Sequence, residues 1–345
     1  MFDHPAFEAH EGVHAFHDPD SGLRCLIAIH STHLGPSAGG CRMWSYANSG
    51  EMVTDALRLS QGMSYKNAMA GLDLGGGKAV IWGDSHRDKS PELFRAFGRA
   101  VEQLQGRYYT AEDVGIDVAD IQIAGEETRF AAGLGVGADA SGDPSPVTAL
   151  GVFEGMKAAA ERAFGSSDLA GRTVAVQGVG SVGGYLCSHL AEAGARILIC
   201  DVDRAALTSV AEATGAEIIS PEEIYDQDAD IFSPNALGAV INEGTLERLK
   251  VSVIAGGANN QLVIPEMGEL LRRRGILYAP DYVINAGGII NVAAEIRGGY
   301  DRAWVDTKLE TMVSTLCHVL DTALQDGVAT NRIADQIARE RIGRG

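Results

Sequence analysis

The first part of the chain mixes two hydrophobic periods. The apolar run at 26–29 predicts a buried strand, and a second strand is expected at 78–82. Between them, apolar residues recur three and four positions apart from about 51 to 70, which predicts a helix. Another helix is expected from Pro91 to Leu104, because proline favours the first helical turn. These elements indicate an α/β unit.

The pattern changes after Pro144, where two prolines precede an alanine-rich helix predicted over 147–162. Short apolar runs then alternate with helical segments up to a helical tail at 305–342. The runs are at 173–176, 195–201, 230–232, 251–254 and 276–278. Such alternation predicts a doubly wound parallel sheet of the Rossmann type.

A domain boundary is therefore placed near Pro144. We expect a first α/β domain over 1–143 and a nucleotide-binding Rossmann domain over 144–319. The C-terminal helix, about 320–345, is expected to pack back on the first domain.

Composition narrows the function classes. The 345 residues suffice for two domains, and 46% hydrophobic with 21% charged residues is typical of a globular protein. A net charge of −18 disfavours binding to nucleic acid or to anionic membrane surfaces. The N-terminal residues lack the basic and apolar stretches of a secretory signal, and no apolar run is long enough for a spanning helix.

Cysteine usage indicates a reducing compartment. The count is odd, the spacings are wide and no Cys-x-x-Cys occurs, so free thiols in the cytoplasm are expected rather than disulfides or structural zinc. Histidines at positions 10, 14 and 17 have helical spacing, but no acidic or cysteine ligands complete a metal site. We expect packed or surface histidines and no metal.

Gly178-x-Gly180-x-x-Gly183 carries the clearest cofactor signal. It follows a predicted strand, opens a predicted helix, and Asp201 ends the next strand. The glycines permit a tight turn, close approach of a pyrophosphate and helix–strand packing. Asp201 can accept hydrogen bonds from the adenosine ribose, which favours NAD, while nearby Arg204 leaves some tolerance of NADP open. A glycine-rich turn without nucleotide is the alternative.

Lys66, Lys78 and Asp113 carry the candidate chemistry. Three glycines precede Lys78, but the next residue, Ala79, lacks the hydroxyl that a phosphate loop needs for magnesium. We expect the glycines to let a substrate approach the backbone. Burial and neighbouring positive charge disfavour a protonated amine, so one lysine can move protons while the other holds a carboxylate. Solvated surface lysines are the alternative.

Eight stretches in order along the chain match one enzyme family. They are 35–43, 62–66, 75–81, 109–115, 142–151, 176–183, 255–262 and 279–288. Through them the chain resembles the glutamate/leucine/phenylalanine/valine dehydrogenases, and most of all the leucine dehydrogenase branch. The resemblance implies two domains around a cleft, the first also an oligomerisation domain, and NAD-dependent reversible deamination of an L-amino acid to a 2-oxo acid and ammonium. A homo-oligomer is expected by analogy.

The resemblance also assigns residues. Lys78 would activate water for attack on the imine carbon, and Asp113 would assist proton transfer at nitrogen. Lys66 would bind the substrate carboxylate. The other substrate-binding residues implied are Gly39, Gly40, Met63, Ala38, Ala111, Asn260, Ile289 and Val292. The cofactor residues implied are Arg42, Thr148, Gly178, Val179, Gly180, Ser181, Val182, Gly183, Asp201, Val202, Ala236, Leu237, Ala258, Asn259 and Asn285.

Substrate preference stays open between two classes. The pocket candidates Ala111, Ile289 and Val292 are uncharged and aliphatic, which favours branched-chain substrates over glutamate. Ile289 and Val292 share one helix face, and plain helix core is their alternative role. Ala38 replaces the leucine common in leucine dehydrogenases and leaves room for an aromatic substrate such as phenylalanine. Ile116-Asp117 also departs from the small hydroxyl residues usual there. A non-catalytic nucleotide-binding protein is disfavoured, because both lysines and Asp113 are present.

Overall fold

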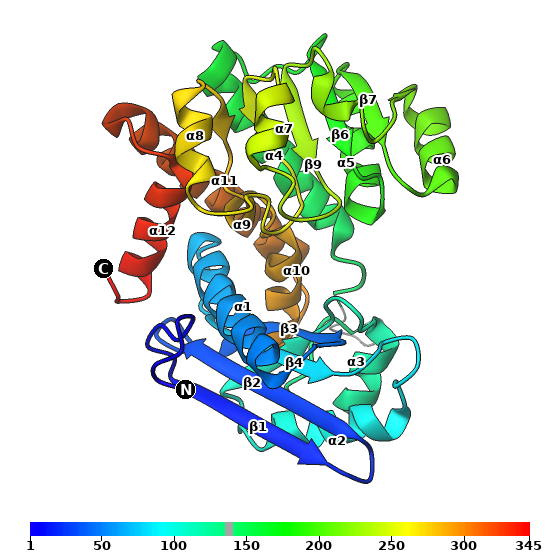
Figure 1. The fold of residues 1–345 in the computed structure, drawn as a ribbon, viewed down its shortest axis with the longest axis vertical. Coiled ribbons are helices and arrows are strands. Elements are labelled where there is room, and N and C mark those ends of the chain that lie inside the picture. Colours follow the sequence, from blue (N-terminus) through cyan, green and yellow to red (C-terminus); the bar gives the residue numbers. More distant parts are fainter. Residues whose placement is uncertain (135–140) are drawn as a thin grey trace. The chain divides into compact units, whose positions relative to one another are not determined.

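The chain forms two compact units in the computed structural model, which describes residues 1–134 and 141–345 (Figure 1). The first unit comprises Met1–Pro144, Ile289–Asp306 and Ala338–Gly345. The second comprises Ser145–Gly288 and Thr307–Ile337. Both combine a β-sheet with helices, so the predicted α/β class is confirmed.

The first unit is built on a five-stranded mixed sheet. Its strands are β1 (Gly12–Asp18), β2 (Leu23–Ser31), β3 (Ser37–Trp44), β4 (Gly75–Trp82) and β5 (Tyr108–Ala111). They lie in the order β1-β2-β4-β3-β5, with β3, β4 and β5 parallel and β1 and β2 joined by antiparallel pairing. Because β3 lies between β4 and β5, residues of β4 and residues that follow β5 lie on either side of it.

Helices cover both faces of this sheet. Helix α1 (Ser49–Met69) packs on one face with Met52, Ala56 and Leu57. Helices α2 (Pro91–Glu102) and α3 (Val118–Gly125) pack on the other, where they share a large apolar core. Helix α2 begins at Pro91 as expected, and α1 begins two residues before the expected position 51. The side chains of Asn48 and Ser90 cap these helices by accepting hydrogen bonds from free backbone N–H groups.

The second unit is built on a six-stranded parallel sheet. Its strands are β6 (Thr173–Gln177), β7 (Arg196–Cys200), β8 (Glu217–Ile218), β9 (Ile231–Pro234), β10 (Val253–Ile254) and β11 (Leu277–Tyr278). The order β11-β10-β9-β6-β7-β8 is the Rossmann order, with the strand sequence reversing between β6 and β9. Ligands bind such sheets at this switch point.

The remaining elements are helical and join these strands. They are α4 (Ser145–Phe164), α5 (Ser181–Glu192), α6 (Arg204–Thr214), η1 (Ile224–Asp226), α7 (Glu243–Arg248), α8 (Met267–Arg273), α9 (Asp281–Ile284), α10 (Gly287–Ile296), α11 (Arg302–Asp326) and α12 (Thr330–Arg341). Within the described ranges, no helix is long and apolar enough to cross a membrane.

The division of the chain differs from the expected ranges in two places. Residues 289–306 belong to the first unit, where Asn291 donates to Ser141 O. Most of the tail, Thr307–Ile337, belongs to the second unit, where Tyr282 donates to Asp335 and Thr330 donates to Tyr278 O. Only Ala338–Gly345 returns to the first unit. Hydrophobic periodicity along the chain does not show on which unit a distant segment packs.

The N-terminal histidines belong to a strand rather than a helix. His14 and His17 lie on β1, which pairs antiparallel with β2. His10 and His30 are buried side by side with ring centroids 4.8 Å apart. They bond Ser60 and Ser64, respectively. Among the described residues, no group of three or more His, Cys, Asp or Glu side chains could hold a metal.

Candidate active site

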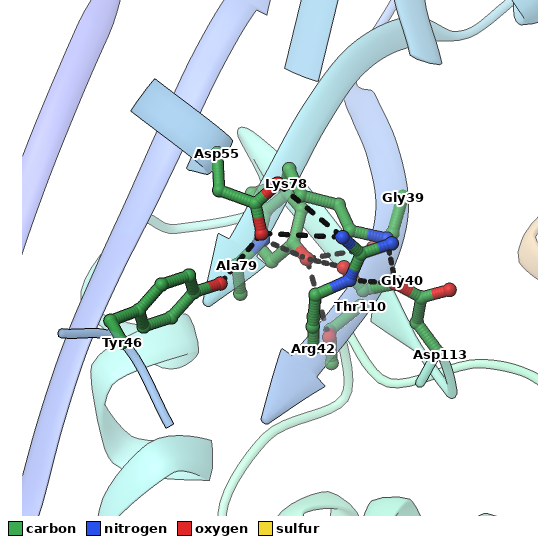
Figure 2. Close-up of polar contacts among 10 residues, drawn as sticks. Gly39, Gly40, Arg42, Tyr46, Asp55, Lys78, Ala79, Thr110 and Asp113 are labelled. Carbon is green, nitrogen blue, oxygen red and sulfur yellow. Dashed lines mark hydrogen bonds and ion pairs between the residues drawn. The ribbon is translucent and has the colours of Figure 1, made fainter. Parts of the chain in front are cut away.

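A buried ion pair forms the centre of the candidate site in the first unit (Figure 2). Lys78, on β4, is only 4% exposed, and its Nζ donates to Asp113 Oδ2 at 2.7 Å. Asp113 follows β5, on the far side of β3 from Lys78. Gly40 of β3 makes the approach possible, since a Cβ there would lie 2.8 Å from Asp113 Cβ. The structure therefore brings the two predicted catalytic residues into contact.

Arg42 supplies a second cation to Asp113. Its Nε donates to Asp113 Oδ2 at 3.2 Å, and its Nη1 donates to both oxygens of Asp55 at 3.2 and 3.3 Å. Asp55 Oδ2 also accepts the Tyr46 hydroxyl at 2.6 Å. Arg42 is thus fixed by two carboxylates (Figure 2). Arg42 belongs to the first unit, whereas the other candidate cofactor residues belong to the second.

The charges of this cluster support one another. Burial on its own would raise the pKa of Asp113, but Lys78 and Arg42 outweigh it, and the pKa is lowered. Burial would likewise lower the pKa of Arg42, yet Asp113 and Asp55 raise it. Asp113 is therefore an anion at neutral pH. Such a pair can accept and return a proton beside a bound substrate.

Lys66 lies on the last turn of α1, half-buried, in a position where helix carbonyls favour a cation. Helix and strand touch nearby, since a Cβ on Gly76 would lie 2.0 Å from Ser64 N. Ser64 lies two residues before Lys66 on α1, and Gly76 lies two residues before Lys78 on β4. The two lysines therefore come from one helix–strand contact, as chemistry on an amino acid carboxylate and amine would need.

The backbone of β3 lies beside both catalytic candidates. Gly39 O accepts the buried Tyr108 hydroxyl at 2.7 Å, and a Cβ on Gly39 would meet Met63 Cγ at 3.0 Å. Ala38, just before, is fully buried. The predicted substrate residues Gly39, Gly40 and Met63 are thus neighbours.

The glycines before Lys78 have a different role from the one expected. Gly75 to Gly77 are buried in β4, and a Cβ there would meet protein atoms: Ser31 O at 2.0 Å from Gly75 and Ser37 Oγ at 2.8 Å from Gly77. The space is filled by the chain itself, so the expectation that these glycines admit a substrate was wrong. They permit close packing of β4 with its neighbours.

An apolar cluster in the first unit contains three of the predicted pocket residues. Ala111, Ala132 and Val292 are buried together, with Ile289 and Ile296 packed against them. Ala132 escaped the sequence analysis because nothing distinguishes it locally. The cluster is uncharged, as an aliphatic or aromatic side chain would require.

One carboxylate fastens the segment beside this cluster. Glu295 Oε2 accepts from Gly133 N, Ser141 N and Ser141 Oγ at 3.0, 3.1 and 2.8 Å. Its Oε1 accepts from Leu134 N at 3.3 Å. Because Glu295 and Val292 share helix α10, this carboxylate ties the helix to Gly133, Leu134 and Ser141.

The nucleotide candidates of the second unit surround the loop after β6. Gly178 has a positive φ of 93°, and a Cβ on it would meet Ala236 Cβ at 2.7 Å, so the loops after β6 and β9 touch at the switch point. A Cβ on Gly183 would meet Gly178 O at 2.0 Å, whereas one on Gly180 would meet nothing within 4 Å. Gly180 opens α5 without a side-chain cap, which leaves helix N–H groups for a phosphate.

Asp201 directly follows β7 and has a fixed orientation. Its two oxygens accept from Val179 N at 2.7 Å and Asp203 N at 2.9 Å. The next residue, Val202, is 92% exposed. A carboxylate held at this strand end fits the ribose of a dinucleotide.

The remaining cofactor candidates lie along the loops after β9 and β10 and on two helices. Asn285 donates to Asn259 Oδ1 at 2.8 Å, while its own Oδ1 is buried without a hydrogen-bond partner among the described residues. Leu237 is 77% exposed. Thr148 is buried on α4 near Gly287, whose Cβ would lie 2.7 Å from Thr148 Cα. The buried Oδ1 of Asn285 can accept a hydrogen bond, and the carboxamide group of a ligand could donate it.

Positions 181, 182 and 258 lie at the start of α5 and after β10, beside the same loops. Asn260 adopts a positive φ of 51°. The free N–H groups at the start of α5, the uncrowded Gly180 and the carboxylate of Asp201 together fit a nicotinamide dinucleotide.

Comparison with known proteins agrees with this geometry. Residues 10–130 match the sequence model of the Glu/Leu/Phe/Val dehydrogenase dimerisation domain. Residues 141–208 and 198–343 match that of the Glutamate/Leucine/Phenylalanine/Valine dehydrogenase domain. The chain belongs to the Glu/Leu/Phe/Val dehydrogenase family. It is accordingly an amino acid dehydrogenase that uses a nicotinamide cofactor.

Individual relatives span almost the whole chain. Leucine dehydrogenase of Thermoactinomyces intermedius is 50% identical over 99% of this chain and 93% of its own length. Phenylalanine dehydrogenase of Bacillus thermotolerans is 46% identical over 96% and 88%. Among solved structures, L-tryptophan dehydrogenase from Nostoc punctiforme has a TM-score of 0.85 at 41% identity, covering 97% of this chain and 96% of that one.

Proposed function

We propose that this protein catalyses the NAD-dependent, reversible oxidative deamination of branched-chain aliphatic L-amino acids to 2-oxo acids and ammonium. The Lys78–Asp113 ion pair, buried beside Arg42, carries the proposal, since it places a proton-moving amine and a fixed anion together. The 50% identity to a leucine dehydrogenase over 99% of the chain supports the substrate class.

The proposed roles follow from position and chemistry. Lys66 binds the substrate carboxylate, assisted by the backbone at Gly39 and Gly40. Asn260, in the second unit, keeps its assignment as a substrate residue. Lys78 takes a proton from the water that attacks the imine carbon, and Asp113 assists proton transfer at the nitrogen. A nicotinamide ring held by the cofactor candidates would supply the hydride acceptor for the reaction.

NAD is proposed over NADP because Asp201 is an anion held by two backbone N–H groups at the end of β7. Its carboxylate hydrogen-bonds ribose hydroxyls and repels a 2′-phosphate. Gly178, Gly180 and Gly183 would form the pyrophosphate turn. The other cofactor candidates keep their assignments as part of this proposal.

Aromatic substrates form the second candidate. The buried Ala38 is small, and a phenylalanine dehydrogenase is 46% identical to the chain. The apolar cluster around Ala111 and Val292 suits either class, since neither leucine nor phenylalanine brings a charge. The ratio of kcat/KM for leucine, valine and phenylalanine separates the two.

We further propose that the first unit binds substrate and mediates homo-oligomerisation, that the second binds NAD, and that the enzyme works in the cytoplasm. The description of the matched dimerisation domain supports self-association. Free cysteines at all five positions suit a reducing compartment.

A panel of L-amino acids with NAD, followed by NADH absorbance, tests the proposal directly. Leucine, valine and isoleucine should give the highest kcat/KM. Lys78→Ala should abolish turnover while NAD binding, measured by calorimetry, persists. Absence of turnover with every aliphatic and aromatic amino acid would refute the proposed activity.

A further inference from the structure

Asp55 is an acidic residue on the face of α1 that packs against the sheet. Its neighbours Met52 and Ala56 are buried in the apolar cluster on that face. The Asp55 carboxylate is instead partly enclosed, at 27% side-chain exposure, and receives Arg42 Nη1 and the Tyr46 hydroxyl. The proposed reaction gives Asp55 no role. A carboxylate here therefore needs a separate explanation.

The charges of the cluster balance only when Asp55 is counted. Lys78 and Arg42 are cations, and Asp113 and Asp55 are anions, in one connected chain of contacts. Without Asp55, a single carboxylate would serve two cations through the same oxygen, Asp113 Oδ2. Arg42 would then compete with Lys78 for that oxygen. The carboxylate of Asp55 occupies the other end of the guanidinium.

The geometry fixes the direction in which Asp55 acts. The guanidinium of Arg42 is planar and rigid, and it contacts Asp113 through Nε and Asp55 through Nη1. Anchoring Nη1 therefore sets the position of Nε, and Nε helps to hold Asp113. Tyr46, buried after β3, donates to Asp55 at 2.6 Å and holds it in turn. Figure 2 shows this chain of contacts.

We propose that Asp55, held by Tyr46, is a positioning residue for the deamination reaction. It acts through Arg42 to orient Asp113 against Lys78 and to set the pH range in which the pair works. This inference rests on the proposed function, because it takes Lys78 and Asp113 as the proton-moving pair. Asp55 itself contacts neither of them.

Asp55→Asn tests the charge with little change of shape. Removing one anion favours the deprotonated forms of the neighbouring groups. The rising and falling parts of the plot of kcat/KM against pH, here called its pH limbs, should therefore move to lower pH. A unit charge one side chain away, at an effective dielectric constant of about 20, corresponds to a shift of about 1 pH unit. We expect kcat to fall about tenfold, while the KM for the amino acid changes less than threefold.

Two companion variants separate charge from position. Asp55→Glu keeps the anion but moves it, so the pH limbs should stay in place while kcat falls. Tyr46→Phe removes one hydrogen bond and should lower kcat about threefold with unchanged limbs. The control is Asp321→Asn in the second unit, which breaks a two-bond pair with Arg162 at 2.8 and 2.9 Å. It should leave both limbs and kcat unchanged.

A measurement without turnover keeps the inference separate from the proposed function. The reactivity of the Lys78 amine toward acetic anhydride can be followed against pH by mass spectrometry. In Asp55→Asn it should begin at a pH about 1 unit lower than in the wild type. Wild-type limbs and wild-type Lys78 reactivity in Asp55→Asn would overturn the inference. Lack of turnover in the wild type would instead overturn the proposed function.

Discussion

Replacing Asp113 by asparagine preserves shape and removes the anion that faces two cations. The Lys78 side chain is 6% exposed and would lose the carboxylate that lies 2.7 Å from its Nζ. Breaking a buried pair on one side costs about 3–5 kcal/mol. The Asp113 side chain is 23% exposed and Asp55 still balances Arg42, so we expect about 2–3 kcal/mol of lost stability.

The pH dependence of this loss has a definite sign. The folded pKa of Asp113 is lowered, because Lys78 and Arg42 outweigh the effect of burial. Its contribution is therefore complete above the unfolded pKa of about 3.9 and disappears only as pH falls through the lower folded value. The stability gap between wild type and Asp113→Asn should be equal at pH 7 and pH 5.

Urea unfolding, followed by tryptophan fluorescence, measures the difference in free energy of unfolding between the two proteins at both pH values. NADH absorbance measures kcat. Proton transfer by a positioned group contributes about 10²–10⁴-fold, so kcat should fall within that range. Adding Lys78→Met to Asp113→Asn should recover part of the stability, because the buried amine without its carboxylate partner is gone. A free energy of unfolding within about 0.5 kcal/mol of wild type, together with kcat within threefold, would refute this reasoning.

Three further outcomes are expected. Gly76→Ala should lower the free energy of unfolding by about 3 kcal/mol in urea, since its Cβ would lie 2.0 Å from Ser64 N; a loss below 1 kcal/mol would contradict the packing argument. Glu295→Ala removes the acceptor for Ser141 and its neighbours, so the kcat/KM ratio of leucine to phenylalanine should fall severalfold, whereas an unchanged ratio would separate Glu295 from the pocket. Asp201→Ala should raise the NADP-to-NAD ratio of kcat/KM about tenfold, from loss of repulsion; a constant ratio would argue against the assigned ribose contact.

The second unit was predictable because its signals are local. A strand, three glycines at fixed spacing, a helix and an acidic strand end lie within about 30 consecutive residues and need no partner elsewhere. The first unit was harder to predict from the sequence. Strand β3 consists largely of small residues, and β5 is short, so neither shows a hydrophobic period.

The candidate pair Lys78 and Asp113 was predicted from motifs, whereas its surroundings required tertiary structure. The contact between Lys78 and Asp113 depends on β3 lying between β4 and β5. The engagement of Arg42 by Asp55 depends on how α1 packs across that sheet. The role of the glycines at 75–77 was misjudged because their neighbours, Ser31 and Ser37, are distant in sequence.

Helix α10 has a consequence for how the two units can be separated. The helix runs from Gly287 to Ile296, and the boundary between units falls within it, after Gly288. The chain also passes between units at 144/145, 306/307 and 337/338. A single proteolytic cut near Pro144 would therefore leave both units covalently joined by three other crossings. Neither unit can be isolated by shortening the gene from one end.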